Sequence, residues 1–255
     1  NKSGGLRLFS FPSQQEAEGP SASCPLCTAG GAVCDATACV QKWEREHVRD
    51  YYHAAPERSA EGAVWVQSFY DELSTAVGGS SLCCLLEIRK CYEFVVHIGL
   101  WLEAEGTDFP LALLQVALAQ YQGWRLIALE GCHSRQAQSL KGIVAGCGMA
   151  TYLLKCPMLR LLDRLVLQHS SLRFTVYIDD IGIQMVGPRA RIVDPLVAGV
   201  RDTAVALKRQ QLSLAGDQKC VVAGGQDPLV QAAAARLRRL GVAAVRATKN
   251  LGVDY

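Results

Sequence analysis

Residues 174–183 read Phe174-Thr175-Val176-Tyr177-Ile178-Asp179-Asp180-Ile181-Gly182-Ile183. Apolar and polar side chains alternate from Leu172 to Asp179, which is the period-two pattern of a half-buried strand. The apolar spacing resumes at Ile181 and continues to Met185, so the sequence predicts a hairpin with Asp179 and Asp180 at its tip. Adjacent carboxylates repel each other and are an unusual choice for a tight turn. A divalent cation at the tip would explain them, and a solvated acidic turn is the simpler alternative.

A second segment, residues 82–88, is continuously apolar except for Glu87, as expected of a central strand buried on both faces. A carboxylate in such a strand is costly unless it pairs with a cation or lies at the exposed end of the strand. In the palm sheet of reverse transcriptases, whose motifs this segment and the Asp179 hairpin resemble, the corresponding strands are neighbours. We therefore expect two carboxylates that are distant in sequence to converge.

The segment Tyr177-Ile178-Asp179-Asp180 in an apolar hairpin resembles the Tyr-x-Asp-Asp catalytic motif of reverse transcriptases. Glu87 stands where that family has its first metal-binding aspartate. Glutamate keeps the charge but adds a methylene, which moves the carboxylate in a site whose geometry must be tight. Tyr92, five positions later, stands where the family carries a bulky aromatic that excludes a ribose 2′-hydroxyl. A core aromatic on the following helix is the alternative for Tyr92.

Further segments are similar to the motifs of the same family, in the same order. Lys2 and Arg7 flank a glycine pair, as in the fingers motif whose basic residues reach the incoming triphosphate, although an ordinary basic hairpin fits as well. Gly146 matches the glycine of the Pro-Gln-Gly-Ser-type turn, which lets template and nucleotide approach the backbone, while Ala145 replaces the glutamine. Lys219 precedes a strand and resembles a lysine that assists the pyrophosphate leaving group. A lysine at a strand edge is the alternative that we favour for it.

The resemblance covers nearly the whole chain and implies an α+β fold, namely a polymerase palm with an antiparallel sheet backed by helices, plus partial fingers and no thumb. We expect residues 1–78 to form the fingers part with a Cys-rich insertion, and residues 79–255 to form the palm, with 123–141 returning to the fingers. The end of the chain, 249–255, resembles the family's Leu-Gly element. Together with residues 145–147 it also resembles reverse-transcriptase-like sequences of dinoflagellates, which suggests a fragment of a retroelement protein.

In function, the resemblance implies an RNA-directed DNA polymerase, a nucleotidyltransferase that uses two Mg²⁺ or Mn²⁺ ions. Asp179 would be the principal metal ligand, Glu87 its partner and Asp180 auxiliary. The partners would be an RNA template, a DNA primer and deoxynucleoside triphosphates. A decayed palm that binds nucleic acid or a partner without catalysis is the second hypothesis, favoured by Glu87 and Ala145. An RNA-dependent RNA polymerase is the third, and the Tyr92 position argues against it.

The composition sets broad limits on the class of protein. The chain has 255 residues, of which 50% are hydrophobic and 20% charged, as in ordinary globular proteins. A net charge of +2 does not by itself support nucleic-acid binding. Lys155 and Arg160 interrupt the longest apolar run, so we expect no membrane span and an intracellular protein, nuclear or cytoplasmic.

Cysteine is frequent, with 11 residues, most of them in apolar segments where the thiol behaves as a small hydrophobic group. An odd number without a secretory signal argues for a reducing compartment. Cys24, Cys27, Cys34 and Cys39 superficially suggest a zinc site within the insertion. Their spacing is unlike that of a zinc ribbon and no histidine lies nearby, so a loop without metal is the favoured interpretation.

Overall fold

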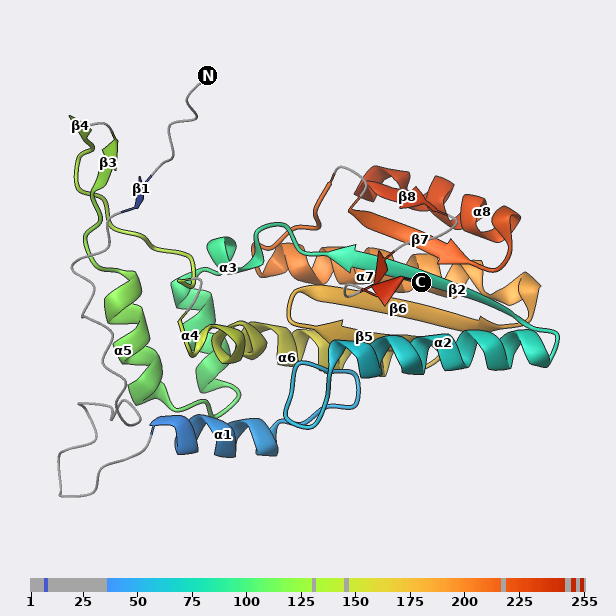
Figure 1. Cartoon of the computed structure of the whole chain (residues 1–255), viewed down its shortest axis with the longest axis horizontal. Helices are drawn as coiled ribbons and strands as arrows, with labels where there is room; N and C mark the ends of the chain where they lie inside the picture. Colours follow the sequence, from blue (N-terminus) through green and yellow to red (C-terminus); the bar gives the residue numbers. More distant parts are fainter. Residues whose placement is uncertain are drawn as a thin grey trace.

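A five-stranded sheet is the centre of the fold (Figure 1). The computed structural model describes residues 7–8, 36–129, 132–144, 147–216, 219–245, 249–250 and 253–254. The strands of the sheet are β2 (Ser80–Glu87), β5 (Arg173–Tyr177), β6 (Asp180–Gly187), β7 (Cys220–Gly224) and β8 (Val242–Ala244), in the order β5-β6-β2-β7-β8. All neighbours are antiparallel except β7 and β8. The predicted α+β palm with an antiparallel sheet is confirmed, and the parallel edge strand is an addition to it.

Helices α6 (Ala150–Gln168) and α7 (Val193–Arg209) cover one face of the sheet, and α8 (Asp227–Leu237) packs beside α7 (Figure 1). Side chains alternate along a strand, and every second residue of β2, namely Leu82, Cys84 and Leu86, belongs to the buried core beneath these helices. The apolar spacing of residues 193–207 is typical of a helix with one buried face, and α7 spans them.

The opposite face of the sheet carries α2 (Ala60–Ala76), whose first turn is capped by the Ser59 hydroxyl accepting from the Gly62 N–H at 3.0 Å. Gln67 in the middle of α2 hydrogen bonds to Cys83 of β2, and the Gln184 amide of β6 donates to the Gln67 carbonyl oxygen at 2.9 Å. Cys83 and Gln184 are directly opposite in the sheet register. Because alternate residues share a face, Glu87 and Asp180 lie on this same face, away from α6 and α7.

The remaining elements lie beside the end of the sheet or connect its parts (Figure 1). The helices are α1 (Ala36–Glu46), α3 (Cys91–Phe94), α4 (His97–Glu105) and α5 (Leu111–Tyr121), with two 3₁₀ turns, η2 (Arg189–Arg191) and η3 (Arg238–Leu240). The short strands are β1 (Arg7–Leu8), β3 (Ile127–Leu129), β4 (Cys132–His133), β9 (Lys249–Asn250) and β10 (Val253–Asp254). β1 pairs with β3, so the first described residues lie against segment 123–141. The division into fingers and palm at residue 78 stays a prediction.

A buried ion pair joins α1 to α6. Lys155 is 1% exposed and its Nζ lies 3.5 Å from a carboxylate oxygen of Glu44, which is 3% exposed. The ammonium also lies over the rings of Trp43 and Tyr52, at 5.6 and 4.9 Å from their centroids. Lys155, which interrupts the apolar run in the sequence, therefore fixes α1 to the core. No helix in the described part of the chain is long and apolar enough to cross a membrane.

Candidate active site

The turn between β5 and β6 is the tightest element of the candidate site. Tyr177 pairs with Asp180, so Ile178 and Asp179 alone form the connection between the strands. Ile178 has a φ of +59°, a conformation that β-branched side chains rarely adopt. The sequence predicted both aspartates at the hairpin tip, whereas the structure has Asp179 in the turn and Asp180 as the first residue of β6. Such strain is typical of positions that the surrounding fold holds in place for function.

The strand register brings the carboxylates of β2 and β6 together. Glu87 is directly opposite Asp180, and side chains at such positions have Cβ atoms about 5 Å apart. The backbone of this end of β2 is held on both sides. The Ile88 N–H donates to the Asp179 carbonyl oxygen at 3.3 Å, and the Ala215 N–H donates to the Glu87 carbonyl oxygen at 2.8 Å. The expected convergence of Glu87 with the aspartate hairpin is therefore seen, with Asp180 rather than Asp179 as its cross-strand partner.

Lys219 lies on the other side of Glu87. β7 pairs with β2 with Val221 opposite Leu85, and continuing that register by two residues puts Lys219 beside Glu87. The Lys219 Nζ is 2.6 Å from Glu87 Oε1, in a contact where the side chains are 58% and 33% exposed. This hydrogen bond raises the pKa of Lys219. Glu87 thus stands between an ammonium and a second carboxylate, and the strand-edge interpretation of Lys219 missed this contact.

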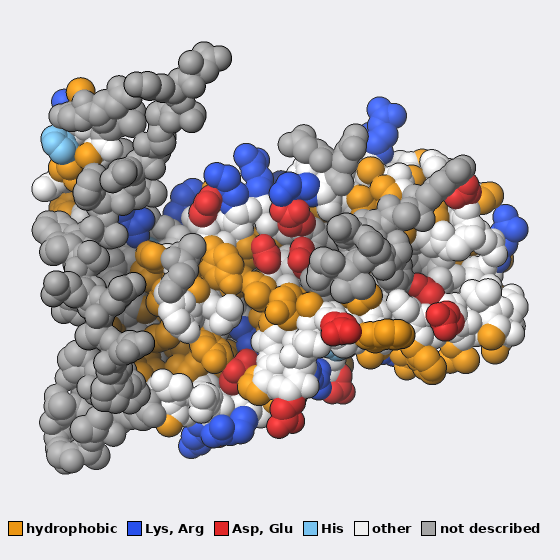
Figure 2. Space-filling model, viewed as in Figure 1, with side chains coloured by type: hydrophobic (Ala, Val, Ile, Leu, Met, Phe, Trp, Pro, Cys, Tyr) orange, Lys and Arg blue, Asp and Glu red, His pale blue; other side chains and the backbone are white. Residues whose placement is uncertain are grey.

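The two aspartates are hard to ionise where they stand. The pKa of Asp180 is raised to about 6, chiefly by burial and then by the charges of Asp179 and Glu87, while Lys219 acts in the opposite direction. Burial also raises the pKa of Asp179, against the effect of a backbone hydrogen bond, and the charge of Glu87 adds to the rise. The three carboxylates therefore repel one another, and Lys219 alone does not compensate for that repulsion. Figure 2 shows acidic side chains in the middle of one face of the molecule, with Lys and Arg side chains beside them.

Tyr92 of α3 lies close enough to the hairpin for its pKa to be raised by burial first and by the charge of Asp179 second. The segment that leads into the glycine-rich turn holds α3 in place. The Ile143 N–H donates to the Tyr92 carbonyl oxygen at 2.7 Å, and the Gly142 N–H donates to the Val95 carbonyl oxygen at 2.8 Å. Gly142 has a φ of +101°, and an added Cβ would lie 3.3 Å from the Glu93 carbonyl oxygen, so glycine is required there. Tyr92 and the hairpin are therefore near enough for the charge of Asp179 to act on the Tyr92 hydroxyl.

Other predicted site residues are not placed by the structure. Lys2, Gly146, Cys24, Cys27 and Cys34 lie outside the described residues, as does Ala145. Arg7 is described only through its backbone pairing with Ala128. Cys39 lies in α1 with its side chain partly exposed. Within the described ranges, no group of three or more His, Cys, Asp or Glu side chains is arranged closely enough to hold a metal ion unaided.

The fold has counterparts among solved structures. Telomerase from Candida tropicalis in the apo form matches with a TM-score of 0.53 and 11% identity, over 74% of this chain and 36% of that chain. Apo telomerase from the same organism, truncated from its C-terminal domain, matches with a TM-score of 0.52 and 12% identity, over 74% of this chain and 40% of that one. The chain has a reverse-transcriptase-like fold. No family model and no curated protein matches the sequence.

This reverse-transcriptase-like chain spans less than half of the telomerase chains that it matches. At such low identity the likeness concerns the fold, and it places the five-stranded sheet in the class of polymerase palms. The origin in a retroelement and the likeness to dinoflagellate sequences stay predictions.

Proposed function

We propose that this chain is the palm of an RNA-directed DNA polymerase from a retroelement, which adds deoxynucleotides to a DNA primer on an RNA template. The observation that carries the proposal is the register of β2 and β6. It pairs Glu87 with Asp180 and leaves Asp179 in the adjoining turn, so that three acidic residues lie at one end of the sheet. Paired carboxylates at this position of the fold are suited to nucleotidyl transfer.

The residues supply donor atoms that suit a divalent cation, but the described side chains do not form a metal-binding cluster as they stand. Carboxylate oxygens are the ligands that Mg²⁺ and Mn²⁺ prefer. Burial is the main cause of the raised pKa values of Asp179 and Asp180, and neighbouring negative charge, which a bound cation would offset, is a further cause. Bound Mg²⁺ would supply Lewis-acid activation of the primer 3′-hydroxyl and neutralise charge on the leaving pyrophosphate. Asp179, Asp180 and Glu87 would hold the metal. Lys219 would be placed to donate to the leaving group once released from Glu87.

The residues that would contact the substrate come from the sequence resemblance. Tyr92, whose pKa is raised first by burial and second by the charge of Asp179, would exclude a 2′-hydroxyl on the incoming nucleotide, because its ring would occupy the volume that this hydroxyl needs. Lys2 and Arg7 would bind the triphosphate, and Gly146 would let the template approach the backbone. These three assignments rest on the sequence resemblance.

A second candidate function is a decayed palm that binds nucleic acid or a protein partner without catalysis. The Lys219–Glu87 contact at 2.6 Å favours it, because the ammonium already neutralises the carboxylate that a metal would use. The longer Glu87 side chain, where the family has aspartate, favours it as well.

Primer extension on an RNA template with Mg²⁺ distinguishes the two candidates. If the chain is a polymerase, the parent extends the primer with deoxynucleotides, Asp179→Asn abolishes extension, and Asp50→Asn, a matched change of a fully exposed aspartate, does not alter it. Primer-template binding without extension in the parent, with extension gained by Glu87→Asp, would instead establish a palm decayed at one residue. Preference for ribonucleotides would contradict the role of Tyr92. Absence of both binding and extension in all variants would refute both candidates.

A further inference from the structure

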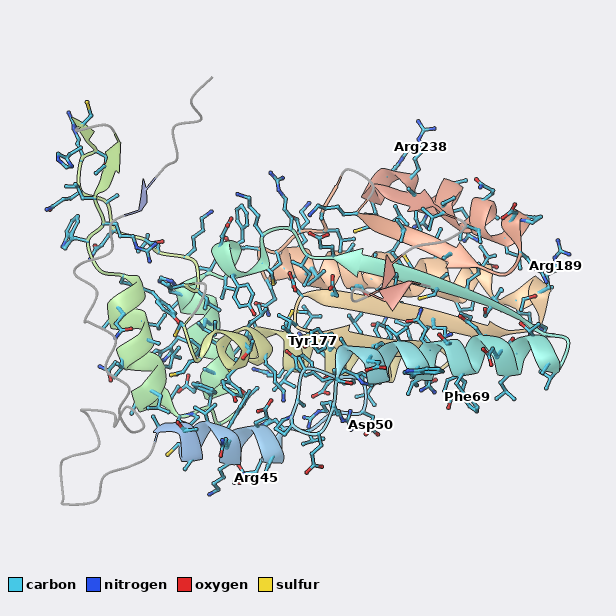
Figure 3. All side chains as sticks on the ribbon, viewed as in Figure 1. Arg45, Asp50, Phe69, Tyr177, Arg189 and Arg238 are labelled. Carbon is cyan, nitrogen blue, oxygen red and sulfur yellow. The ribbon has the colours of Figure 1, made fainter. Side chains whose placement is uncertain are left out.

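The outer face of α2 is an exposed apolar stripe. Trp65, Phe69 and Leu73 follow one another at helical spacing and are 70%, 59% and 45% exposed. Val66 and Val77 widen the stripe, at 38% and 75% exposed. Figure 3 shows Phe69 pointing away from the ribbon, and Figure 2 shows hydrophobic side chains gathered along the edge of the molecule where α2 runs. A stripe of this kind on a soluble protein marks an interaction surface.

Acidic residues border the stripe. Glu61 precedes Trp65 by one helical turn and Glu72 follows it by two, so both lie on the Trp65 side of the stripe. Both side chains are exposed, and neither makes an ion pair with another described residue. Nucleic acid is a poor occupant for this face because its phosphates would meet these carboxylates. A partner surface complementary to this stripe would be apolar in its middle and basic along its edges.

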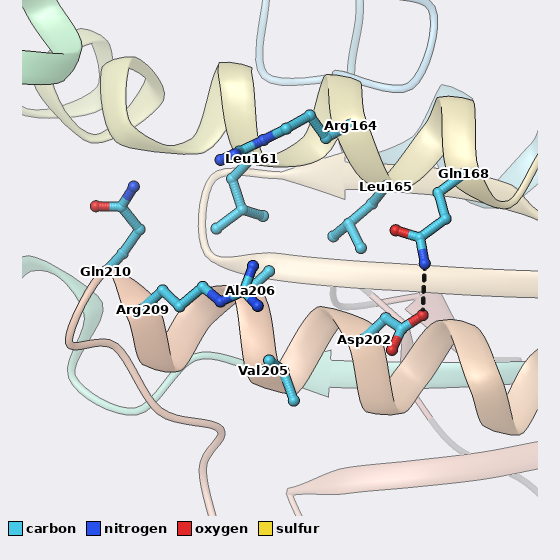
Figure 4. Close-up of a pocket in the computed structure, with 9 residues that line it drawn as sticks. All are labelled: Leu161, Arg164, Leu165, Gln168, Asp202, Val205, Ala206, Arg209 and Gln210. Carbon is cyan, nitrogen blue, oxygen red and sulfur yellow. Dashed lines mark hydrogen bonds between the residues drawn. The ribbon is translucent and has the colours of Figure 1, made fainter.

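The groove between α6 and α7 has that chemistry (Figure 4). It encloses a cavity of about 200 Å³ floored by Leu161 and Leu165 of α6 and Ala206 of α7. Arg164 from α6 and Arg209 from α7 extend over it from opposite sides, as Figure 4 shows. Within the described part of the chain, neither arginine has a carboxylate partner.

The one carboxylate that lines the groove is already engaged. Asp202 accepts from the Gln168 amide at 2.9 Å and lies 2.9 Å from His169 Nε2, so it is not placed to neutralise the arginines. A second cavity of about 120 Å³ shares Arg209 with the first and extends the groove to α4, where Ile98 and Leu102 are exposed. The groove is therefore apolar along its length and positively charged where the arginines lie.

We propose that α2 of one copy of this chain docks into the α6–α7 groove of a second copy. The lining side chains come from two neighbouring helices at i, i+3 and i+4 positions, which is the geometry that accepts a third helix. The stripe supplies Trp65 and Phe69 for the apolar floor, and Glu61 and Glu72 face Arg164 and Arg209. Since the two surfaces differ and lie on opposite faces of the sheet, the contact is head-to-tail and produces chains or rings of subunits. The polymerase assignment plays no part in this inference.

A charge-swap experiment on the whole chain tests the proposal by sedimentation velocity over a range of protein concentrations. The parent associates as its concentration rises. Arg164→Glu with Arg209→Glu places acidic side chains in the groove, and Glu61→Lys with Glu72→Lys places basic ones on the stripe. In a solution of either double variant alone, the stripe and the groove carry charges of the same sign. We expect self-association to be at least about tenfold weaker than in the parent. An equimolar mixture of the two variants presents opposite charges at every contact and recovers the association of the parent.

Matched controls and contrary results make the test decisive. Arg189→Glu with Arg238→Glu changes two exposed arginines outside the groove and leaves association as in the parent (Figure 3). Recovery on mixing also shows that both variants are folded. A parent that is monomeric at every concentration, or variants that associate as the parent does, would overturn the proposal. If Arg164→Glu with Arg209→Glu weakens RNA binding but not self-association, the groove binds nucleic acid, and this result would also overturn the proposal.

Discussion

Replacement of Asp180 by Asn is predicted to stabilise the fold at neutral pH and to leave its stability unchanged in acid. The pKa of Asp180 rises from 3.8 to about 6, chiefly through burial and then through the charges of Asp179 and Glu87. Since one pKa unit corresponds to about 1.36 kcal/mol, the ionised carboxylate costs about 3 kcal/mol of folding free energy. Asparagine has a similar shape and carries no charge, so it avoids that cost.

The sign of the pH dependence follows from which state binds the proton more tightly. The native state holds the Asp180 proton up to about pH 6, whereas the unfolded chain releases it near 3.8. The unfolding free energy of the parent therefore falls as the pH rises through this window, and the full cost is present above it. The difference between Asp180→Asn and the parent should grow from near zero below pH 4 to about 3 kcal/mol at pH 7.

Urea unfolding from pH 4 to 8, followed by circular dichroism, measures this difference. Asp50→Asn is the control, because the Asp50 side chain is fully exposed. Added Mg²⁺ should reduce the difference in unfolding free energy between variant and parent at pH 7. It should stabilise the parent more than the variant, since only the parent has the complete set of carboxylates. A difference between variant and parent that is constant across the pH range would refute the electrostatic account of the site.

Three other predictions concern single contacts. Lys219→Met removes the ammonium beside Glu87 and should lower severalfold the Mn²⁺ concentration needed for half-saturation, measured by electron paramagnetic resonance; unchanged binding would show that Lys219 does not compete with the metal. Lys155→Met leaves buried Glu44 unpaired and should lower the free energy of unfolding, measured in urea, by about 3–5 kcal/mol. The double variant Lys155→Met with Glu44→Leu should recover most of that loss, and equal losses in the single and double variants would contradict the pairing. Ile178→Gly should stabilise the fold by about 1 kcal/mol by relieving the positive φ, and destabilisation would show that the turn is not strained.

Local patterns were sufficient to predict much of the fold. The alternation around Phe174 predicted a strand with one buried face, because side chains on a strand alternate between its two faces. The continuous apolar run ending at Glu87 predicted a central strand buried on both faces. The helical spacing of Leu153, Leu159 and Leu162 is typical of a helix with one buried face, and all three are buried in α6. The family order of the motifs then predicted that these strands are neighbours, as the register of β2 and β6 shows.

The site contacts required the three-dimensional register. Lys219 and Glu87 are 132 residues apart, and nothing near Lys219 in the sequence distinguishes a strand-edge lysine from one that binds a carboxylate. The sequence also does not show that Asp179 lies in the turn and Asp180 in the strand, because this depends on which two residues form the turn. The helical spacing of Val66, Phe69 and Leu73 shows that one face of α2 is apolar, but it does not show that this face is exposed.

Incorporation of a single deoxynucleotide on an RNA-templated DNA primer, with and without Mg²⁺, tests the central claim most directly. The measurement compares the parent with Asp179→Asn and with Asp50→Asn. The account predicts Mg²⁺-dependent incorporation by the parent and by Asp50→Asn, and none by Asp179→Asn. Equal incorporation by all three proteins would show that the carboxylates of the β5–β6 hairpin are not the catalytic centre.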